Sequence, residues 1–178
     1  MRTLVLGGIR SGKSRWAESA MTAHPAVRYI ATGPVLEADP SWHRRLAEHR
    51  RRRAPDWATV ETSDVAAALR AEPAAAALVD DLGGWLTAVL DRRGWDGDPP
   101  DVEVEELLAA VDAFAAPLTL VSPEVGLTVV PATAVGRLFA DELGRLNQRL
   151  ADHCDQVVLV VAGHPVWVKT TTDPAGER

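Results

Sequence analysis

One stretch near the beginning of the chain, LVLGGIRSGKSRWAES, constrains the fold more than any other. A short apolar run at 4–6 meets a glycine-rich turn, and a helical pattern begins at Lys13. The turn matches the phosphate-binding motif G-x-x-x-x-G-K-[ST], which requires a buried strand before it and a helix after it. The eight residues of the motif are Gly7, Gly8, Ile9, Arg10, Ser11, Gly12, Lys13 and Ser14. The sequence therefore predicts a P-loop between the first strand and the first helix.

Each residue type in this motif has a physical task. The glycines let the backbone curl so that successive N–H groups point inward at a phosphate. Lys13 can reach the outer phosphates of a nucleotide, and the Ser14 hydroxyl can hold Mg2+. The alternative is a glycine-rich turn that only caps an ordinary helix, but motif and context together favour the nucleotide site.

Short apolar runs and helical patterns alternate along the rest of the chain. The runs are predicted to be strands at 3–6, 27–31, 58–60, 75–79, 118–121, 156–161 and 166–168. The periodic segments are predicted to be helices at 13–21, 41–52, 64–71, 82–92, 102–114 and 134–152. This alternation is typical of an α/β fold with a mainly parallel sheet and helices on both faces. We expect one domain at 1–169 and a mobile C-terminal tail at 170–178.

Composition narrows the class of protein. The 178 residues suit one domain with its own core, and 47% hydrophobic and 25% charged residues are ordinary for a globular protein. A net charge of -6 disfavours a nucleic-acid partner. No apolar run approaches the roughly 20 residues of a membrane span. The one cysteine, Cys154, cannot pair within the chain, and no signal segment precedes the first strand, so a cytoplasmic setting is expected.

A P-loop needs a carboxylate that orients the metal ion, usually at the end of a neighbouring buried strand. The segment AAALVDD ends in two such residues, Asp80 and Asp81. Adjacent residues at a strand end point to opposite faces, so the two are not expected to serve the metal equally. Asp81 suits the N-cap of the helix that starts at Leu82. Asp80 is therefore favoured for Mg2+, with simple helix capping as the alternative for either residue.

A second candidate group lies in the segment SWHRRLAEHRRRR. Trp42, Leu46 and His49 have helical spacing, which places His49 at the edge of an apolar face and turns His43 away from it. A neutral imidazole there could attack a phosphorus while the arginines at 50–53 screen the phosphate charge. By spacing alone, a packed histidine beside a solvated arginine run is the stronger interpretation.

Several segments together resemble one known family in their order and spacing. They are GGIRSGKSRWAE (7–18), RYIATG (28–33), His49 followed by PDWATVE (55–61), EVGLTVVP (124–131) and GRLNQRLA (144–151). The family is the bifunctional adenosylcobinamide kinase / adenosylcobinamide-phosphate guanylyltransferase family of cobalamin biosynthesis. The likeness runs from Arg2 to about Lys169. The P-loop alone is generic, but the extension GG-x-RSGKS-x-x-AE together with EVG and R-x-NQ is specific.

The resemblance implies a RecA-like P-loop fold, usually a homotrimer, that carries out two reactions. A nucleoside triphosphate, ATP or GTP, phosphorylates the aminopropanol hydroxyl of adenosylcobinamide. GTP then guanylylates an enzyme histidine, and the substrate phosphate takes the GMP to give adenosylcobinamide-GDP. The family's histidine corresponds to His49, which with Lys13 is the expected catalytic pair, and Ser14 and Asp80 are the expected Mg2+ ligands. The family's nucleotide-binding positions fall on the P-loop and on Gly33, Pro34, Val35, Arg50, Arg51, Arg52, Arg53, Glu61 and Asp80.

Two further polar residues each have two interpretations. Glu124 follows a buried strand at the carboxyl edge of the sheet, where ligands of such folds bind, but it could equally be a turn residue. Asn147 lies on the apolar side of its helix, where its amide needs partners from either the protein or a ligand. The structural interpretation of Asn147 is slightly favoured.

Two other functions fit a P-loop chain of this kind. One is a different small-molecule kinase, which would form no covalent bond to a nucleotide. The other is a RecA-like regulatory ATPase that acts on a macromolecule, for which a long basic or aromatic surface would be expected. The only concentrated basic run is 50–53, which disfavours this second alternative.

Overall fold

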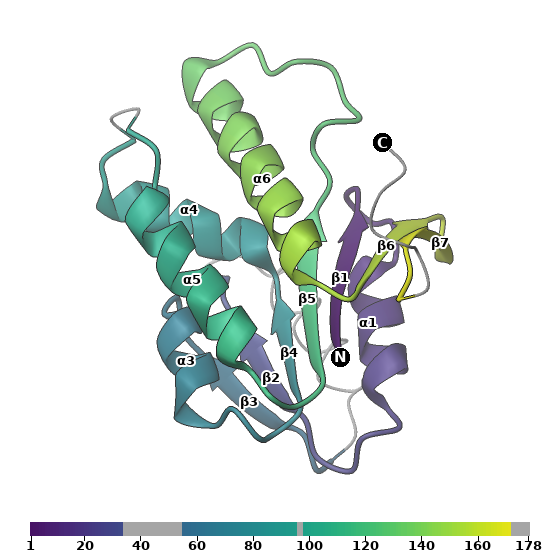
Figure 1. Ribbon diagram of the computed structural model, residues 1–178. Helices are drawn as coiled ribbons and strands as arrows, with labels where there is room; N and C mark the ends of the chain where they lie inside the picture. The colour runs from purple at the N-terminus through teal and green to yellow at the C-terminus, as the bar shows by residue number, and fades with distance from the viewer. Residues whose placement is uncertain (34–54, 96–97, 172–178) are drawn as a thin grey trace.

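A seven-stranded sheet forms the centre of the computed structural model, which describes residues 1–33, 55–95 and 98–171. The strand order is β3-β2-β4-β5-β1-β6-β7 (Figure 1). The strands are β1 Arg2–Gly7, β2 Arg28–Ala31, β3 Ala58–Glu61, β4 Ala77–Asp80, β5 Leu118–Pro123, β6 Gln156–Val161 and β7 His164–Lys169. All pairs are parallel except β6 with β7. The parallel strands therefore end at one common edge, the carboxyl edge.

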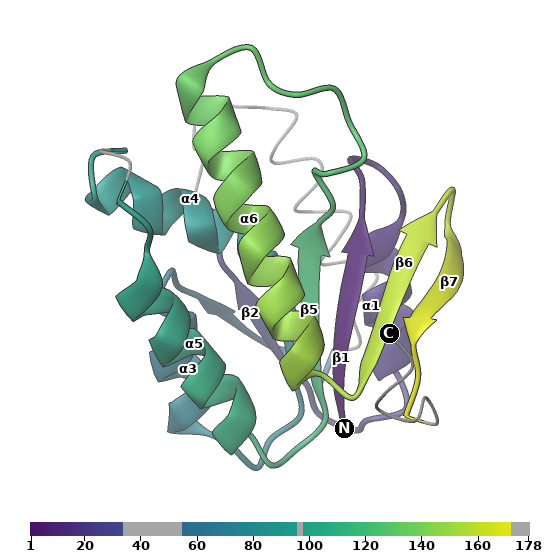
Figure 2. The same cartoon turned by 45° about the horizontal axis from the view of Figure 1, so that its top comes forward.

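Helices cover both faces of this sheet among the described residues. They are α1 Lys13–Met21, α3 Val65–Ala71, α4 Leu82–Arg92, α5 Asp101–Ala113 and α6 Ala134–His153. The first lies on one face and the other four lie on the opposite face (Figures 1 and 2). The predicted α/β fold, with a mainly parallel sheet and helices on both faces, is confirmed. The helix predicted at 41–52, and the predicted tail from residue 172 on, lie outside the described residues.

The core has two layers because neighbouring residues on a strand point to opposite faces. Leu4 and Val5 on β1 are both fully buried, yet they belong to different layers. The larger layer packs against α3, α4, α5 and α6, and the smaller layer includes Ala17 and Met21 of α1. Since both faces of the central strands are covered, their sequences are continuous apolar runs without a polar alternation.

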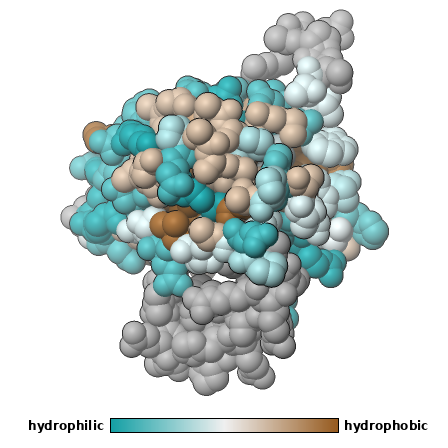
Figure 3. Space-filling view, turned by 90° about the horizontal axis from the view of Figure 1, so that it is seen from below, coloured by the Kyte–Doolittle hydropathy of each residue, from teal (hydrophilic) through white to brown (hydrophobic). Residues whose placement is uncertain are grey.

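The two edges of the sheet expose different surfaces. Seen from the amino ends of the strands, the molecule shows mainly hydrophilic and weakly apolar residues, with strongly apolar ones confined to small spots (Figure 3). At the carboxyl edge, the segment between β5 and α6 exposes 73% to 91% of Leu127, Val129 and Val130. None of the helices in the described ranges has the length and apolar character needed to cross a membrane.

Candidate active site

The P-loop turns between β1 and α1 through a backbone that only glycine accommodates easily. Gly12 is the N-cap of α1 with a φ of 94°, in the left-handed region. Its neighbour Ser11 is fixed from both sides, since its N–H donates to the Gly8 carbonyl at 3.2 Å and its carbonyl accepts from the Gly163 N–H at 2.7 Å. A Cβ on Gly12 would lie 3.1 Å from the Gly163 Cα. Gly12 has no side chain to cap α1, and Ser11 Oγ accepts from the N–H of Lys13 at 3.3 Å.

The carboxylate of Asp80 lies beside the first turn of α1. Ser14 Oγ donates to Asp80 Oδ1 at 3.1 Å, and Tyr29 Oη donates to Asp80 Oδ2 at 2.6 Å. The register explains the contact with the tyrosine, because Ala31 is the Cα partner of Asp80 and shares its side of the strand with Tyr29. Both predicted metal ligands, Ser14 and Asp80, are therefore together at the end of the phosphate loop.

Asp81 has a different task from Asp80. It is the N-cap of α4, where its Oδ1 accepts from the Gly84 N–H at 2.9 Å, as its position in the sequence predicts. Its carbonyl accepts a hydrogen bond from Thr32 Oγ1. Burial, and then the negative charge of Asp80, raise the pKa of Asp81 above its ordinary value. The two adjacent carboxylates are thus divided between the P-loop and the helix cap.

Two predicted nucleotide-binding residues lie farther along the same edge. Gly33 follows β2 and packs against α4, because a Cβ on Gly84 would lie 3.2 Å from the Gly33 Cα. Glu61 is the exposed last residue of β3 and is the Cα partner of Ala31. The strand order puts β3 four strand spacings from β1, about 19 Å at about 4.8 Å per spacing. Glu61 is therefore well separated from the phosphate cradle.

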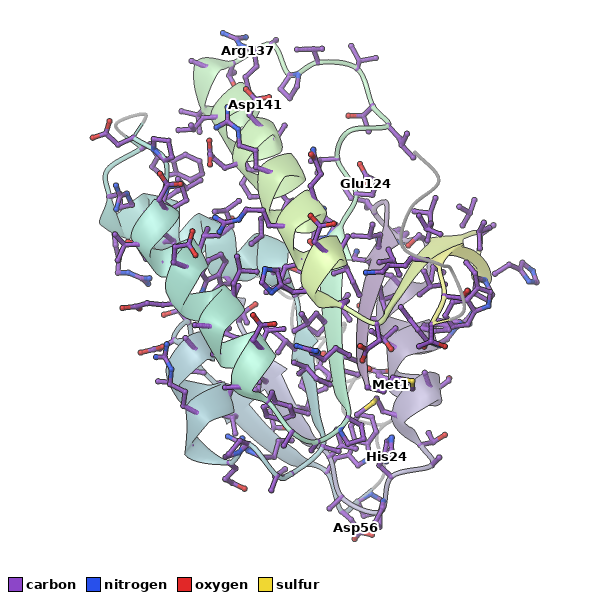
Figure 4. All side chains as sticks on the ribbon, in the orientation of Figure 1. Met1, His24, Asp56, Glu124, Arg137 and Asp141 are labelled. Atoms are coloured by element: carbon purple, nitrogen blue, oxygen red, sulfur yellow. The ribbon has the colours of Figure 1, made fainter. Side chains whose placement is uncertain are left out.

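Glu124 is held at the carboxyl edge by its own backbone and by α6. Its N–H donates to the Gly7 carbonyl at 3.0 Å, and its Oε1 accepts from the Gly126 N–H at 2.6 Å. Asn147 fixes the residues before it, accepting from Ser122 Oγ at 2.6 Å and donating from Nδ2 to the preceding carbonyl at 3.0 Å. Figure 4 shows Glu124 at the top of β5, while Met1, His24 and Asp56 lie at the opposite end. The amide of Asn147 thus has protein partners, as its structural interpretation requires.

Sequence reasoning missed two residues that shape this site. Tyr29 supplies the second hydrogen bond to Asp80, and Thr32 ties the end of β2 to the end of β4. A tyrosine inside the apolar segment VRYIATG was the available signal, since a buried phenol usually finds a hydrogen-bond partner. Strand order was needed to identify that partner. The predicted residues Pro34, Val35, His49, Arg50, Arg51, Arg52 and Arg53 lie outside the described residues.

The donor set fits a magnesium ion shared with a nucleotide. Mg2+ prefers oxygen ligands, and it is usually held by one or two protein groups together with phosphates and waters. Ser14 and Asp80 supply a hydroxyl and a carboxylate next to the phosphate loop. Within the described ranges, no group of three or more His, Cys, Asp or Glu side chains could hold a metal by itself. A hydroxyl and a carboxylate beside a phosphate loop suit a metal ion that the phosphates of a nucleotide also hold.

Comparisons with known proteins identify the family of this chain. A family model described as cobinamide kinase / cobinamide phosphate guanyltransferase matches residues 3–168. The bifunctional adenosylcobalamin biosynthesis protein CobP of Pseudomonas aeruginosa is 44% identical, over 95% of this chain and 98% of the relative. The proteins of the same description named CobU are 37% identical in Salmonella typhimurium and 36% in Escherichia coli, each over 95% of this chain and 100% of the relative. The chain belongs to the cobinamide kinase / cobinamide phosphate guanyltransferase family.

Proposed function

We propose that this chain is a bifunctional enzyme that phosphorylates adenosylcobinamide and then transfers GMP from GTP to the product, giving adenosylcobinamide-GDP. The observation that carries the proposal is the P-loop whose Ser14 donates a hydrogen bond to Asp80, in a chain matched by the family model from 3 to 168. The relatives from three bacteria are described as bifunctional, which supports two reactions on one chain.

One cradle can serve both reactions because each uses a nucleoside triphosphate. In phosphorylation, the loop and Lys13 stabilise charge on the transferring γ-phosphoryl group. In GMP transfer, the same loop holds the pyrophosphate that leaves, while a nucleophile attacks the α-phosphorus from the opposite side. Mg2+ on Ser14 and Asp80 would neutralise phosphate charge in both cases. Residues 1–169 would act as one catalytic domain.

The nucleophile that we propose for GMP transfer is His49. Its support is the helical spacing that its position in the sequence shares with Trp42 and Leu46, the arginines at 50–53, and its correspondence to the family's histidine. Attack by the imidazole on the α-phosphorus of GTP releases pyrophosphate and leaves GMP on the histidine. The phosphate of the substrate then takes the GMP and frees the imidazole. Two easier steps replace one difficult step, and a covalent intermediate is predicted.

Incubation with adenosylcobinamide, ATP, GTP and Mg2+, followed by mass spectrometry of the corrinoids, tests the function. We expect adenosylcobinamide phosphate first and adenosylcobinamide-GDP second. A corrinoid phosphate without the GDP product would indicate a small-molecule kinase alone. Turnover of nucleotide with no change in the corrinoid would indicate an ATPase of another function.

Label from α-labelled GTP tests the nucleophile. His49→Ala should abolish covalent labelling and GMP transfer, yet it should spare phosphorylation, which needs no protein nucleophile. The label on the wild type should be lost in acid and survive mild alkali, as expected of a phosphorus–nitrogen bond to imidazole. His43→Ala is the matched control, because helical spacing turns His43 away from the stripe. Labelling of another residue in the His49 variant would contradict this mechanism.

The assembly and the cellular location stay predictions. The family resemblance implies a homotrimer, and the exposed apolar side chains of Leu127, Val129 and Val130 offer material for a subunit contact. Light scattering on the purified chain at several concentrations tests the trimer. A cytoplasmic setting is predicted from the single cysteine, Cys154, which is a buried free thiol.

A further inference from the structure

Glu124 directly follows β5, the strand that separates the P-loop strand from the strand of Asp80. The sheet order places β5 between β1 and β4, and Pro123 is the Cα partner of Gly7. We propose that Glu124 is the catalytic base of the phosphorylation step, taking the proton from the attacking hydroxyl group. This inference rests on the function proposed above and names a residue for one of its two reactions.

The position of Glu124 suits a base better than a metal ligand. Val121 is the Cα partner of Asp80, so Glu124 extends three residues farther out from the sheet than Asp80 does. At about 3.3 Å per residue this is about 10 Å. Its N–H donates a hydrogen bond to the carbonyl of Gly7, which is the first residue of the P-loop motif. Glu124 therefore lies beyond the strand ends beside the P-loop, whereas Asp80 lies deeper, beside Ser14.

The position is also firmly held, as catalysis requires of a group that must meet a reacting atom. Ser122 and the carbonyl of Pro123 are both bonded to Asn147 of α6, so the residues before Glu124 are anchored. One carboxylate oxygen, Oε1, accepts from the N–H of Gly126. With the residues that the structure describes, the carboxylate makes no ion pair. Its second oxygen can therefore accept a proton from a substrate.

The other described carboxylates at this edge have different tasks. Both oxygens of Asp80 accept hydrogen bonds from hydroxyl groups. Asp81 caps α4. Glu61 lies on β3, about 19 Å from the P-loop strand across the sheet at about 4.8 Å per spacing. Among the described carboxylates at this edge, Glu124 is the one next to the P-loop strand whose side chain neither caps a helix nor contacts the metal-binding serine.

In the proposed step, one proton moves to Glu124 and one phosphorus–oxygen bond replaces another. The primary or secondary hydroxyl of the substrate loses its proton to the carboxylate of Glu124, and its oxygen forms a bond to the γ-phosphorus. The bond between the γ-phosphorus and the bridging oxygen breaks, and its electron pair leaves with the nucleoside diphosphate. The carboxylic acid then returns the proton to water. GMP transfer needs no such base, because its acceptor is already an ionised phosphate.

The test compares Glu124→Gln with the wild type in the two reactions separately. Glutamine can still accept from the Gly126 N–H, so the turn is retained while the base is lost. Single-turnover phosphorylation of adenosylcobinamide at saturating ATP and Mg2+ should fall by about 100-fold or more. Covalent labelling by α-labelled GTP should stay within about twofold of the wild type. Glu124→Asp should fall between the two, because its carboxylate is one methylene shorter.

Asp141→Asn is the matched control, since Asp141 is an exposed carboxylate on α6 near the same end of the molecule (Figure 4). It should leave both reactions unchanged. A Glu124→Gln variant that phosphorylates within threefold of the wild type would overturn the inference. Equal losses in both reactions, with a lowered melting temperature, would also overturn it and make Glu124 a structural turn residue. If the wild type phosphorylates no corrinoid, the proposed function fails instead.

Discussion

Two neighbouring strands, β4 and β5, each deliver a carboxylate to the carboxyl edge, and the two carboxylates are held in opposite ways. Asp80 is fixed through its side chain, because Ser14 and Tyr29 donate to its two oxygens. Glu124 is fixed through its backbone, by the Gly7 carbonyl and by the anchored residues before it. A carboxylate bonded by hydroxyl groups beside the P-loop suits a metal ion. One with an uncommitted oxygen farther out suits proton transfer.

The largest effect is expected from removing the lysine of the P-loop, which lies near the carboxyl ends of β4 and β5. Lys13→Ala should lower phosphorylation and GMP labelling each by about 1,000-fold, because both reactions depend on the same charge at the outer phosphates. Arg15→Ala removes a neighbouring positive charge outside the motif and is the control. Rate measurements of the two half-reactions check this. Near-normal activity of the lysine variant in either reaction would show that the two reactions do not share one cradle.

The next effect separates the two adjacent aspartates. Asp80→Asn keeps the size of the side chain but loses the charge that we propose holds the metal, so turnover at limiting Mg2+ should fall by about 100-fold. Asp81→Asn should change turnover little, because asparagine caps a helix as well as aspartate does. Thermal unfolding should be similar for both variants. A loss of turnover in the Asp81 variant instead would reverse the assignment of the metal ligand.

A smaller effect is expected from removing the hydroxyl group of Tyr29, which donates a hydrogen bond to Asp80. Tyr29→Phe removes the donor to Oδ2, so the Mg2+ concentration for half-maximal rate should rise about tenfold, with the maximal rate retained. The free energy of unfolding should fall by about 1 kcal/mol. Thr3→Val removes another buried hydroxyl, which bonds Gln156 away from the site. If Thr3→Val shifts the Mg2+ dependence equally, the effect belongs to the fold and not to Asp80.

The smallest effect concerns Cys154, far from either strand end. Burial raises the pKa of this thiol to about 12. The unfolded chain, with an ordinary thiol pKa near 9.0, binds fewer protons than the folded chain between these values, so stability should fall as pH rises from about 9 to about 12. At neutral pH, iodoacetamide should modify the thiol in urea but not in the native protein. Rapid native modification would show that the end of α6 packs less firmly on the sheet than the burial of Cys154 indicates.

The sequence predicted the elements well because each one is encoded locally. The first helix, Lys13–Met21, and the fourth, Leu82–Arg92, have their predicted bounds, since the P-loop and the Asp81 cap mark their starts. The predicted strand at 75–79 begins at Ala77 in the structure and ends one residue later, at Asp80. Short alanine-rich runs carry little information about where a strand begins. The fold class was predicted for the same local reason, because short apolar runs alternate with helical patterns along the chain.

Such local patterns could not predict the order of the strands in the sheet. They therefore could not predict the contacts between residues on different strands at the site. The hydrogen bond from Tyr29 to Asp80 needs β2 and β4 to be neighbours. The bonds of Asn147 need α6 to lie over the end of β5. Only an assembled sheet brings these residues together, so the sequence could identify the candidates but not their partners. The motif and the acidic end of a later buried strand did single out Ser14 and Asp80, which the structure brings into contact, and their role as metal ligands stays a prediction.

The central claim is that Asp80 serves the metal and Glu124 serves the proton, and a Mg2+ titration of the phosphorylation rate tests it most directly. The rate of Asp80→Asn should recover substantially as Mg2+ is raised, because weakened metal binding is offset by concentration. The rate of Glu124→Gln should saturate at the wild-type Mg2+ concentration and stay about 100-fold lower. Recovery of the Glu124 variant by Mg2+, with an unresponsive Asp80 variant, would contradict this division between the two strand ends.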